Sequence, residues 1–198
     1  MPQLQAADLE KKPHLLDQSI ALRDGTTFLV RLHVASDTAA LSRYFEGLSE
    51  ATRRVYGPHP FTKEQAQMFC REIDYSHTLR FVAETATYEF AAYFILRLGV
   101  LDQDAQRYAE YGHPLSPDTD CSLAPSVADA YQERGLGSAL FPMLTAAARR
   151  LGRQRIVLWG GVRADNPRAE HFYRKLGFVE YGQFEAGGRN NYSMMLDL

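Results

Sequence analysis

The sequence has few cysteines, no long apolar run and no excess of charge of either sign, and each shortage excludes a class of protein. Its two cysteines, Cys70 and Cys121, show neither metal-ligand spacing nor a disulfide framework, so we expect no metal site and a reducing compartment, the cytoplasm. Twenty-two Lys and Arg stand against 24 Asp and Glu, which leaves no basic field for nucleic acid or an anionic membrane. The first twenty residues lack the apolar run of a secretory signal, and no segment is long enough to span a bilayer.

The length and the apolar content then favour a single domain. A chain of 198 residues with 45% apolar residues can bury one sizeable core. Residues 1–18 are polar and aperiodic, and we expect an N-terminal extension that is frayed or docked on the surface. The domain itself is predicted to cover residues 19–198.

Three patterns in the first half predict a hairpin and two helices. Asp24-Gly25 lies between two short runs and suits the positive φ angles of a tight turn. Ser36 is expected to cap one helix, and Thr62 with Gln65 forms a capping box at the start of another. Each helix carries an apolar stripe, formed by Leu41, Tyr44, Phe45 and Leu48 in the first and by Ala66, Phe69, Cys70 and Ile73 in the second.

After these helices the pattern becomes that of strands. Residues 79–83 alternate in polarity, and residues 90–98 form a nearly continuous apolar run, as expected of a central strand. Residues 99–119 are acidic and punctuated by glycine and proline, which indicates an insertion with a short helix at about 105–111.

The C-terminal half alternates between strands and helices. In chain order we expect a strand at 123–127, an amphipathic helix from Leu136 closed by Gly152, a strand at 155–159, a helix from Pro167 to near Gly177, and a hairpin of 178–184 with 191–196 across Gly187-Gly188. The predicted fold is α/β of the mixed α+β type. Its sheet is mixed, mostly antiparallel and six- to seven-stranded, and about four helices flank it.

The turn between Val127 and the following helix is rich in features that suit a phosphate. The first N–H groups of a helix lack backbone partners and lie at the positive end of its dipole, so they bind phosphate oxygens. Glycine at 135 and 137 allows close approach to the backbone, and Arg134 adds charge. The predicted phosphate-binding turn comprises Gln132, Glu133, Arg134, Gly135, Leu136, Gly137 and Ser138.

Two other nucleotide-binding loops are excluded by the same residues. A P-loop requires a lysine directly after its second glycine, but Ser138 and Ala139 follow Gly137. The dinucleotide fingerprint requires a small residue where Leu140 stands, and no acidic ribose ligand lies about 20 residues further on.

The motif Gln132-x-x-Gly135-x-Gly137, followed by Asn166 and by Tyr173-Arg-Lys-Leu-Gly177-Phe178, resembles the GNAT superfamily of N-acetyltransferases. The resemblance covers about residues 21–198 in element order and is specific from Val127 to Phe178. It implies acetyl-coenzyme A as co-substrate, with the backbone around Val127 holding the pantetheine arm and residues 132–138 contacting the pyrophosphate.

The resemblance also implies that Asn166, Phe172 and Tyr173 flank the thioester and that Tyr173 is catalytic, as the acid or hydrogen-bond donor to the departing thiolate. Asn166 could instead cap the helix that begins at Pro167. Phe172 could instead be a core aromatic, and Tyr173 an amphipathic tyrosine on a helix face.

One position departs from the family pattern. Cys121 stands where many relatives carry a glutamate that acts as a base, and a buried structural cysteine is the favoured interpretation. Glu84 and Asp120 are nearby candidates, but a solvated loop carboxylate is the favoured interpretation of each, so the base stays unassigned.

The resemblance implies transfer of an acetyl group to a primary amine by direct attack in a ternary complex. A catalytically silent acyl-CoA-binding domain that acts as a sensor or partner module is the alternative. The acceptor could be a small molecule or a protein, and a homodimer is possible. The acidic insertion, through Asp102, Asp104 and Glu110, could border the acceptor site and attract a cationic amine. A solvated loop or a dimer contact is the alternative for this segment.

Overall fold

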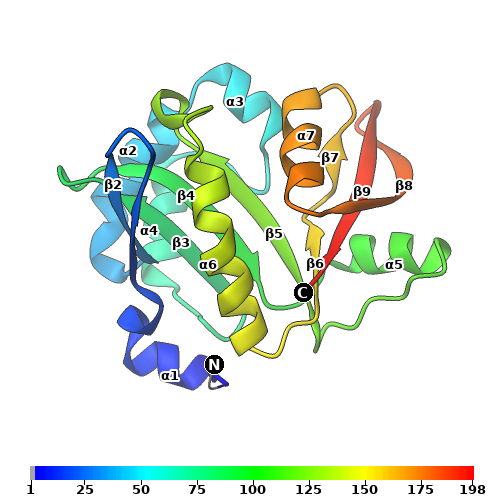
Figure 1. The fold of residues 1–198 in the computed structure, drawn as a ribbon, viewed down its shortest axis with the longest axis horizontal. Coiled ribbons are helices and arrows are strands. Elements are labelled where there is room, and N and C mark those ends of the chain that lie inside the picture. Colours follow the sequence, from blue (N-terminus) through cyan, green and yellow to red (C-terminus); the bar gives the residue numbers. More distant parts are fainter. Residues whose placement is uncertain (1–2) are drawn as a thin grey trace.

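A single sheet runs through the molecule and carries helices on both faces (Figure 1). A computed structural model describes residues 3–198, which contain nine strands in the order β1-β2-β3-β4-β5-β6-β9-β7, with β8 paired to β9. All neighbours are antiparallel except β5 and β6, which are parallel. The strands are β1 (Gln18–Ala21), β2 (Thr27–Leu32), β3 (Thr78–Glu84), β4 (Phe90–Arg97), β5 (Asp120–Val127), β6 (Arg155–Leu158), β7 (Val162–Arg163), β8 (Val179–Ala186) and β9 (Arg189–Asp197).

Seven α-helices accompany the sheet within the described residues. They are α1 (Ala6–Lys11), α2 (Thr38–Gly47), α3 (Glu50–Val55), α4 (Lys63–Arg71), α5 (Asp102–Glu110), α6 (Leu136–Arg150) and α7 (Pro167–Lys175). The predicted mixed α/β fold is confirmed, but the predicted counts of strands and helices were too low. The elements α1, α3 and the two-residue β7 are too short to display a hydrophobic period.

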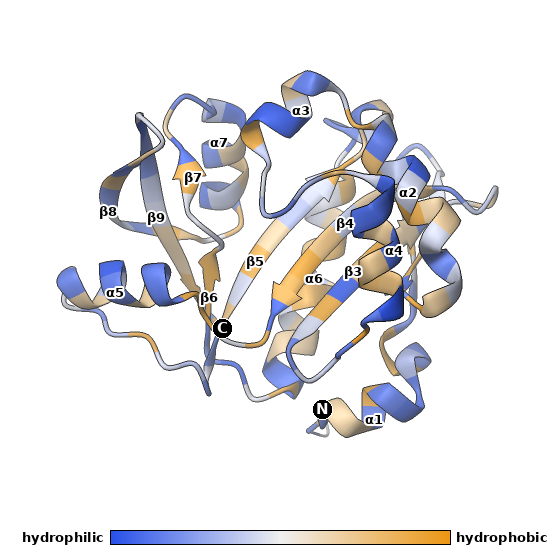
Figure 2. Cartoon of the chain, turned by 180° about the vertical axis from the view of Figure 1, so that it is seen from behind, coloured by the Kyte–Doolittle hydropathy of each residue, from blue (hydrophilic) through white to orange (hydrophobic). Residues whose placement is uncertain are grey.

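The two faces of the sheet bury separate clusters of side chains. Alternate residues of β4 divide between them, with Phe94 and Leu96 in the cluster under α6, and Tyr93 and Ile95 in the cluster under α2 and α4. Figure 2 shows β4 as a largely hydrophobic strand inside this sandwich. The stripes predicted for α2 and α4 enter the second cluster, except Ile73, which follows the end of α4 and packs against the first cluster.

The described part of the N-terminal extension docks onto the first cluster. Leu4, Leu9 and Leu16 are buried there, and the Leu4 N–H donates to the Arg150 carbonyl at the end of α6 (2.8 Å). The sequence left open whether this segment is frayed or docked on the domain, and the structure shows that residues 3–18 are docked.

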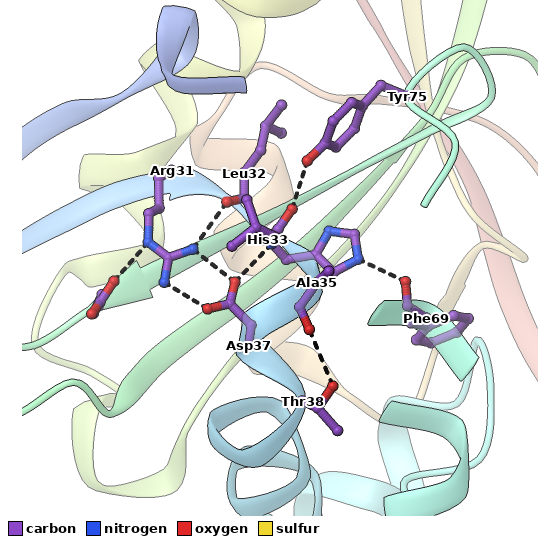
Figure 3. Close-up of polar contacts among 10 residues, drawn as sticks. Arg31, Leu32, His33, Ala35, Asp37, Thr38, Phe69 and Tyr75 are labelled. Carbon is purple, nitrogen blue, oxygen red and sulfur yellow. Dashed lines mark hydrogen bonds and ion pairs between the residues drawn. The ribbon is translucent and has the colours of Figure 1, made fainter. Parts of the chain in front are cut away.

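The start of α2 differs from the expectation that Ser36 caps it. The chain leaves β2 through a 3-10 turn, Ala35–Asp37, and Asp37 holds that turn. The Asp37 carboxylate accepts from the Val34 N–H (2.8 Å) and pairs with the half-buried Arg31 (2.7 Å; Figure 3). Because Arg31 needs a carboxylate partner where water is scarce, a tertiary ion pair rather than a serine cap fixes the turn.

His33, at the end of β2, is fully buried and ties the strand to α4 (Figure 3). Its Nε2 lies 3.0 Å from the Phe69 carbonyl oxygen, so Nε2 carries the proton and donates. The Tyr75 hydroxyl donates to the His33 carbonyl (2.8 Å). Burial lowers the pKa of His33 to about 4, which keeps the ring neutral at pH 7.

The acidic insertion forms α5, which begins at Asp102 rather than near 105 and packs against the β8–β9 hairpin. Asp104 is fully buried, pairs with Arg107 and accepts from the Gly160 N–H (3.2 Å). Tyr111 lies against Gly182 of β8 and donates to the Gln183 carbonyl (3.1 Å). The insertion therefore braces the hairpin and the loop after β6.

Strands β5 and β6 separate part of the way along their length. They pair from Asp120 to Leu123, and the last bond runs from the Trp159 N–H to the Leu123 carbonyl (3.0 Å). From Ala124 to Val127, β5 has no strand partner on this edge within the described residues. An opening in the sheet results, and the candidate site lies there.

Candidate functional site

A cleft of about 830 Å³ lies at the opening between β5 and β6. Its volume falls in the range of small-molecule and cofactor sites. All the predicted site residues except Arg134 line it: Val127, Gln132, Glu133, Gly135, Leu136, Gly137, Ser138, Asn166, Phe172 and Tyr173. Residues predicted from two separate motifs therefore share one cavity.

The free edge of β5 directs the Val127 backbone toward the cleft. The Ala128 N–H donates to the Ala91 carbonyl of β4 (2.9 Å), whereas the Leu123 carbonyl is bonded on the β6 side. Successive residues of a strand turn their backbone groups to alternate edges, so Val127 faces the β6 side as Leu123 does. Its N–H is therefore available to a ligand in the opening.

The turn before α6 presents backbone donors to the same cleft. Gly135 takes a φ of +85°, a left-handed conformation that glycine adopts without strain, and α6 begins at the next residue. The first bond of the helix ladder runs from the Ala139 N–H to the Gly135 carbonyl (3.0 Å). The N–H groups of residues 136–138 precede that ladder and have no side-chain cap, which fits them for phosphate oxygens.

Gly137 and Phe172 pack together across the cleft. A Cβ atom built on Gly137 would lie 3.2 Å from the Phe172 ring, closer than such contacts normally come. The ring of Phe172 also lies edge-on to Tyr173, with centroids 5.3 Å apart. Glycine at 137 thus allows α6 and α7 to approach, and Phe172 both packs and lines the cleft.

Gln132 and Arg134 are held by neighbouring side chains. Gln132 Nε2 donates to the Val127 carbonyl (2.9 Å) and to Thr52 Oγ1 (3.1 Å), which ties the turn to β5 and α3. Arg134 does not line the cleft; it pairs with Asp24 of the β1–β2 turn (2.6 Å) and donates to Thr26 Oγ1 (3.0 Å). In this arrangement Arg134 fastens the turn to the first hairpin.

Asn166 caps a helix and also lies at the wall of the cleft. Its Oδ1 accepts from the Ala169 N–H (3.2 Å), so it caps α7, whose first residue is Pro167. It also lines the cleft. Capping fixes the orientation of the Asn166 side chain at the cavity wall.

Tyr173 is half-buried on α7 with part of its surface in the cleft. Its ring packs edge-on against Phe178, with centroids 5.5 Å apart. Burial raises the pKa of Tyr173 well above its usual value, so the phenol stays protonated and can donate a hydrogen bond even at alkaline pH.

None of the three residues considered as the base lines the cleft. Cys121 is fully buried, its Sγ lies 3.4 Å from the Arg155 carbonyl, and burial raises its pKa to about 12. Asp120 is buried against Arg155 (2.6 Å). Glu84 pairs with Arg31 (2.6 Å). All three serve packing or ion pairs in this fold.

The cleft also has a wall that the sequence motifs do not reveal. Tyr56 and Trp159 pack with the cluster under α2 and α4, so they lie on the face of the sheet opposite Tyr173. Three arginines from distant parts of the chain, Arg54, Arg163 and Arg189, line the cleft as well. The Gly160-Gly161 pair after a buried strand was the one local signal of a loop here.

Comparisons with known proteins agree on the class of the fold. Residues 120–178 match the model of the Acetyltransferase (GNAT) family. That segment holds β5, the turn, α6 and α7, and thus most of the motif residues. The resemblance to the GNAT superfamily that the motifs indicated is therefore confirmed.

Solved structures of GNAT acetyltransferases superpose on nearly the whole chain. The GNAT domain of S. lividans PAT is 23% identical, covers 94% of this chain and 99% of its own, and has a TM-score of 0.75. The ribosomal-protein-S5-alanine acetyltransferase of Vibrio fischeri is 14% identical, with coverages of 91% and 97% and a TM-score of 0.69. Mycobacterium smegmatis RimJ, solved with CoA-disulfide, is 16% identical, with coverages of 91% and 86% and a TM-score of 0.64.

At these identities the likeness establishes the fold. No curated protein matches the chain in a search by sequence. Among residues 3–198, no helix is both long enough and apolar enough to cross a bilayer.

Proposed function

We propose that the chain is an N-acetyltransferase that moves the acetyl group of acetyl-coenzyme A to a primary amine by direct attack in a ternary complex. The observation that carries the proposal is the single cleft that joins the phosphate-binding turn, the open edge at Val127 and Tyr173. In the reaction the coenzyme supplies an activated thioester.

The chain's own groups have distinct parts in this proposal. The N–H groups of residues 136–138 bind the pyrophosphate, and the Val127 N–H polarises an acyl oxygen in the opening. Phe172 and Asn166 line the part of the cleft that holds the pantetheine arm of the coenzyme. Tyr173 donates a hydrogen bond to the departing thiolate. Because a phenol is a weaker acid than a thiol, complete proton transfer to the thiolate is unfavourable, and the hydrogen bond serves in its place.

A catalytically silent acyl-CoA-binding domain is the second candidate, and one observation favours it. Cys121, Asp120 and Glu84 all lie away from the cleft walls, so no carboxylate or thiolate among them reaches the acceptor amine. An amine with an unperturbed lysine-like pKa of about 10.4 is almost entirely protonated at neutral pH and needs to lose that proton before attack.

Two measurements separate the candidates. Calorimetric titration with acetyl-coenzyme A tests binding, and release of coenzyme A in the presence of a panel of amines tests transfer. Binding together with amine-dependent release supports the enzyme. Binding without release for any amine supports the silent domain, and absence of binding contradicts both.

A further inference from the structure

The cleft has a second side, on the face of the sheet opposite the phosphate-binding turn and Tyr173. The turn at 132–138, Phe172 and Tyr173 approach the opening from the side of α6 and α7. Tyr56 and Trp159 border it from the opposite side. A nucleophile and a bound thioester need to meet within the opening, so the second side is where an amine has access.

Three arginines line the cleft together and are here called the arginine rim: Arg54 at the end of α3, Arg163 of β7 and Arg189 at the start of β9. Figures 1 and 2 both show α3 beside β7 and α7, near the end of β5. Arg163 Nη1 donates to the Arg54 carbonyl (2.7 Å), which joins α3 to β7 directly.

The charge of the arginine rim is only partly balanced. Asp165 pairs with Arg163, and the pKa of Asp165 is lowered by that pairing and further by the charges of Arg189 and Arg54, so all three guanidinium groups lie near it. Three guanidinium groups against one carboxylate leave a net charge of +2. Asp165 does not line the cleft, whereas the three arginines do.

The cleft has few carboxylates that could bind a polycation. Glu133 is the only carboxylate among the described residues that line it; it lies on the coenzyme side, 3.6 Å from Arg168. The acidic side chains that the sequence predicts to attract an amine lie elsewhere: Asp104 is buried against Arg107, and Asp102 and Glu110 do not line the cleft. Leu101 and Gln103 of the insertion line the cleft, so the insertion borders it without bringing a carboxylate to its wall.

We propose that the arginine rim binds an anionic group on the acceptor, so that the acceptor is a small amine carrying a carboxylate or an equivalent oxyanion, as in an amino acid. Planar guanidinium groups match such oxyanions through paired hydrogen bonds. Tyr56 and Trp159 beside the rim would cover an apolar side chain of that acceptor. The proposal rests on the acetyltransferase function proposed above.

The test compares acceptors that differ chiefly in charge. Amino acids with apolar side chains are assayed for release of coenzyme A beside the corresponding amino acid amides, and spermidine serves as a polycation. We expect kcat/KM to be at least tenfold higher for the carboxylates than for the amides. Equal values, or a preference for spermidine, would overturn the proposal.

Variants then assign the preference to the arginine rim. Arg54→Gln with Arg189→Gln should raise the KM for the carboxylate acceptor at least tenfold and leave the acetyl-coenzyme A affinity unchanged. Arg149→Gln, an exposed arginine of α6 away from the cleft, is the matched control. A loss of acetyl-coenzyme A affinity in the rim variant would mean that the rim binds a phosphate of the coenzyme instead.

A binding measurement separates failure of the rim from failure of catalysis. The amino acid and its amide are titrated calorimetrically into protein saturated with coenzyme A. Binding of the carboxylate that depends on Arg54 and Arg189, without turnover, would support the rim and contradict acetyl transfer. Turnover of amines without dependence on either arginine would contradict the rim and support acetyl transfer.

Discussion

Tyr173 combines a polar end in the cleft with a ring held by packing, and its substitution tests its chemical role. Tyr173→Phe retains the ring against Phe178 and removes only the hydroxyl. We expect kcat to fall by roughly 10²-fold, the lower end of general-acid effects, because the raised pKa makes the phenol a hydrogen-bond donor rather than a ready acid. Steady-state kinetics and calorimetry on the same preparation measure kcat and the acetyl-coenzyme A Kd.

The acetyl-coenzyme A Kd should not change in Tyr173→Phe. Tyr192→Phe, a half-buried tyrosine of β9 that does not line the cleft, is the control and should retain the wild-type kcat. A Tyr173→Phe enzyme with the wild-type rate would show that this hydroxyl takes no part in thiolate departure.

Gly135 carries the left-handed conformation that opens the phosphate-binding turn. A Cβ on Gly135 meets no atom within 4 Å, so Gly135→Val adds bulk on the ligand side and strains a φ of +85°. We expect a loss of acetyl-coenzyme A affinity of tenfold or more, together with a moderate loss of stability from the strain.

A substitution at a second glycine separates the loss of coenzyme affinity from the loss of stability. Gly152, at the end of α6, has a φ of +73° and lies far from the turn in the helix. Gly152→Val should show a comparable loss of stability with an unchanged Kd, and both are measured by urea unfolding and calorimetry. Equal affinities in the two variants would remove the phosphate role from the turn.

At the scale of elements, α5 depends on a buried charge pair. Asp104→Asn leaves Arg107 without its partner beside Phe184, so we expect the free energy of unfolding to fall by about 3 kcal/mol. Asp102→Asn, on the exposed side of the same helix, should change stability by less than about 0.5 kcal/mol. Urea unfolding measures both, and similar values for the two would contradict a bracing role for Asp104.

The elements that sequence reasoning identified are those whose signals are local. Thr62 accepts from the Gln65 N–H (3.2 Å) as the capping pattern predicted, and Gly25 forms the turn of the first hairpin with a φ of +84°. The phosphate-binding turn is also local, since strand, glycines and helix are consecutive. Such patterns depend on backbone geometry within a few residues, which the sequence alone specifies.

The features that sequence reasoning missed depend on distant residues. Arg54, Arg163 and Arg189 come together only through the packing of α3, β7 and the last hairpin, and no spacing in the sequence relates them. Arg134, which its position in the turn predicts to contact the phosphate, pairs with Asp24 in this structure. Ion pairs between distant elements decide where such long side chains point.

For the molecule as a whole, the buried His33 makes stability depend on pH. Its pKa is about 4 when folded and near 6.5 when unfolded, so between these values the unfolded chain binds a proton that the folded chain does not. Stability is therefore complete above about pH 6.5 and falls as the pH drops toward 4, by about 3 kcal/mol in total from this residue.

His33→Gln, which retains an N–H donor and cannot titrate, should flatten that loss. Urea unfolding at pH 7 and pH 5 gives the comparison, and His14→Gln on the exposed N-terminal segment controls for the substitution itself. An identical decrease in the wild type and in His33→Gln would exclude His33 as the cause.

Because both cysteines are buried, the folded protein should not react with thiol reagents. Cys70 and Cys121 are 3% and 0% exposed, and burial raises the pKa of each thiol, so neither presents a thiolate to a reagent in solution. The cysteines of the folded chain should therefore not react with a chromogenic disulfide reagent. In a native sample, colour then comes only from the free thiol of released coenzyme A. An additional two equivalents of thiol per chain come from unfolded molecules, whose two cysteines have become accessible. One reagent therefore measures both turnover and the fraction of unfolded protein.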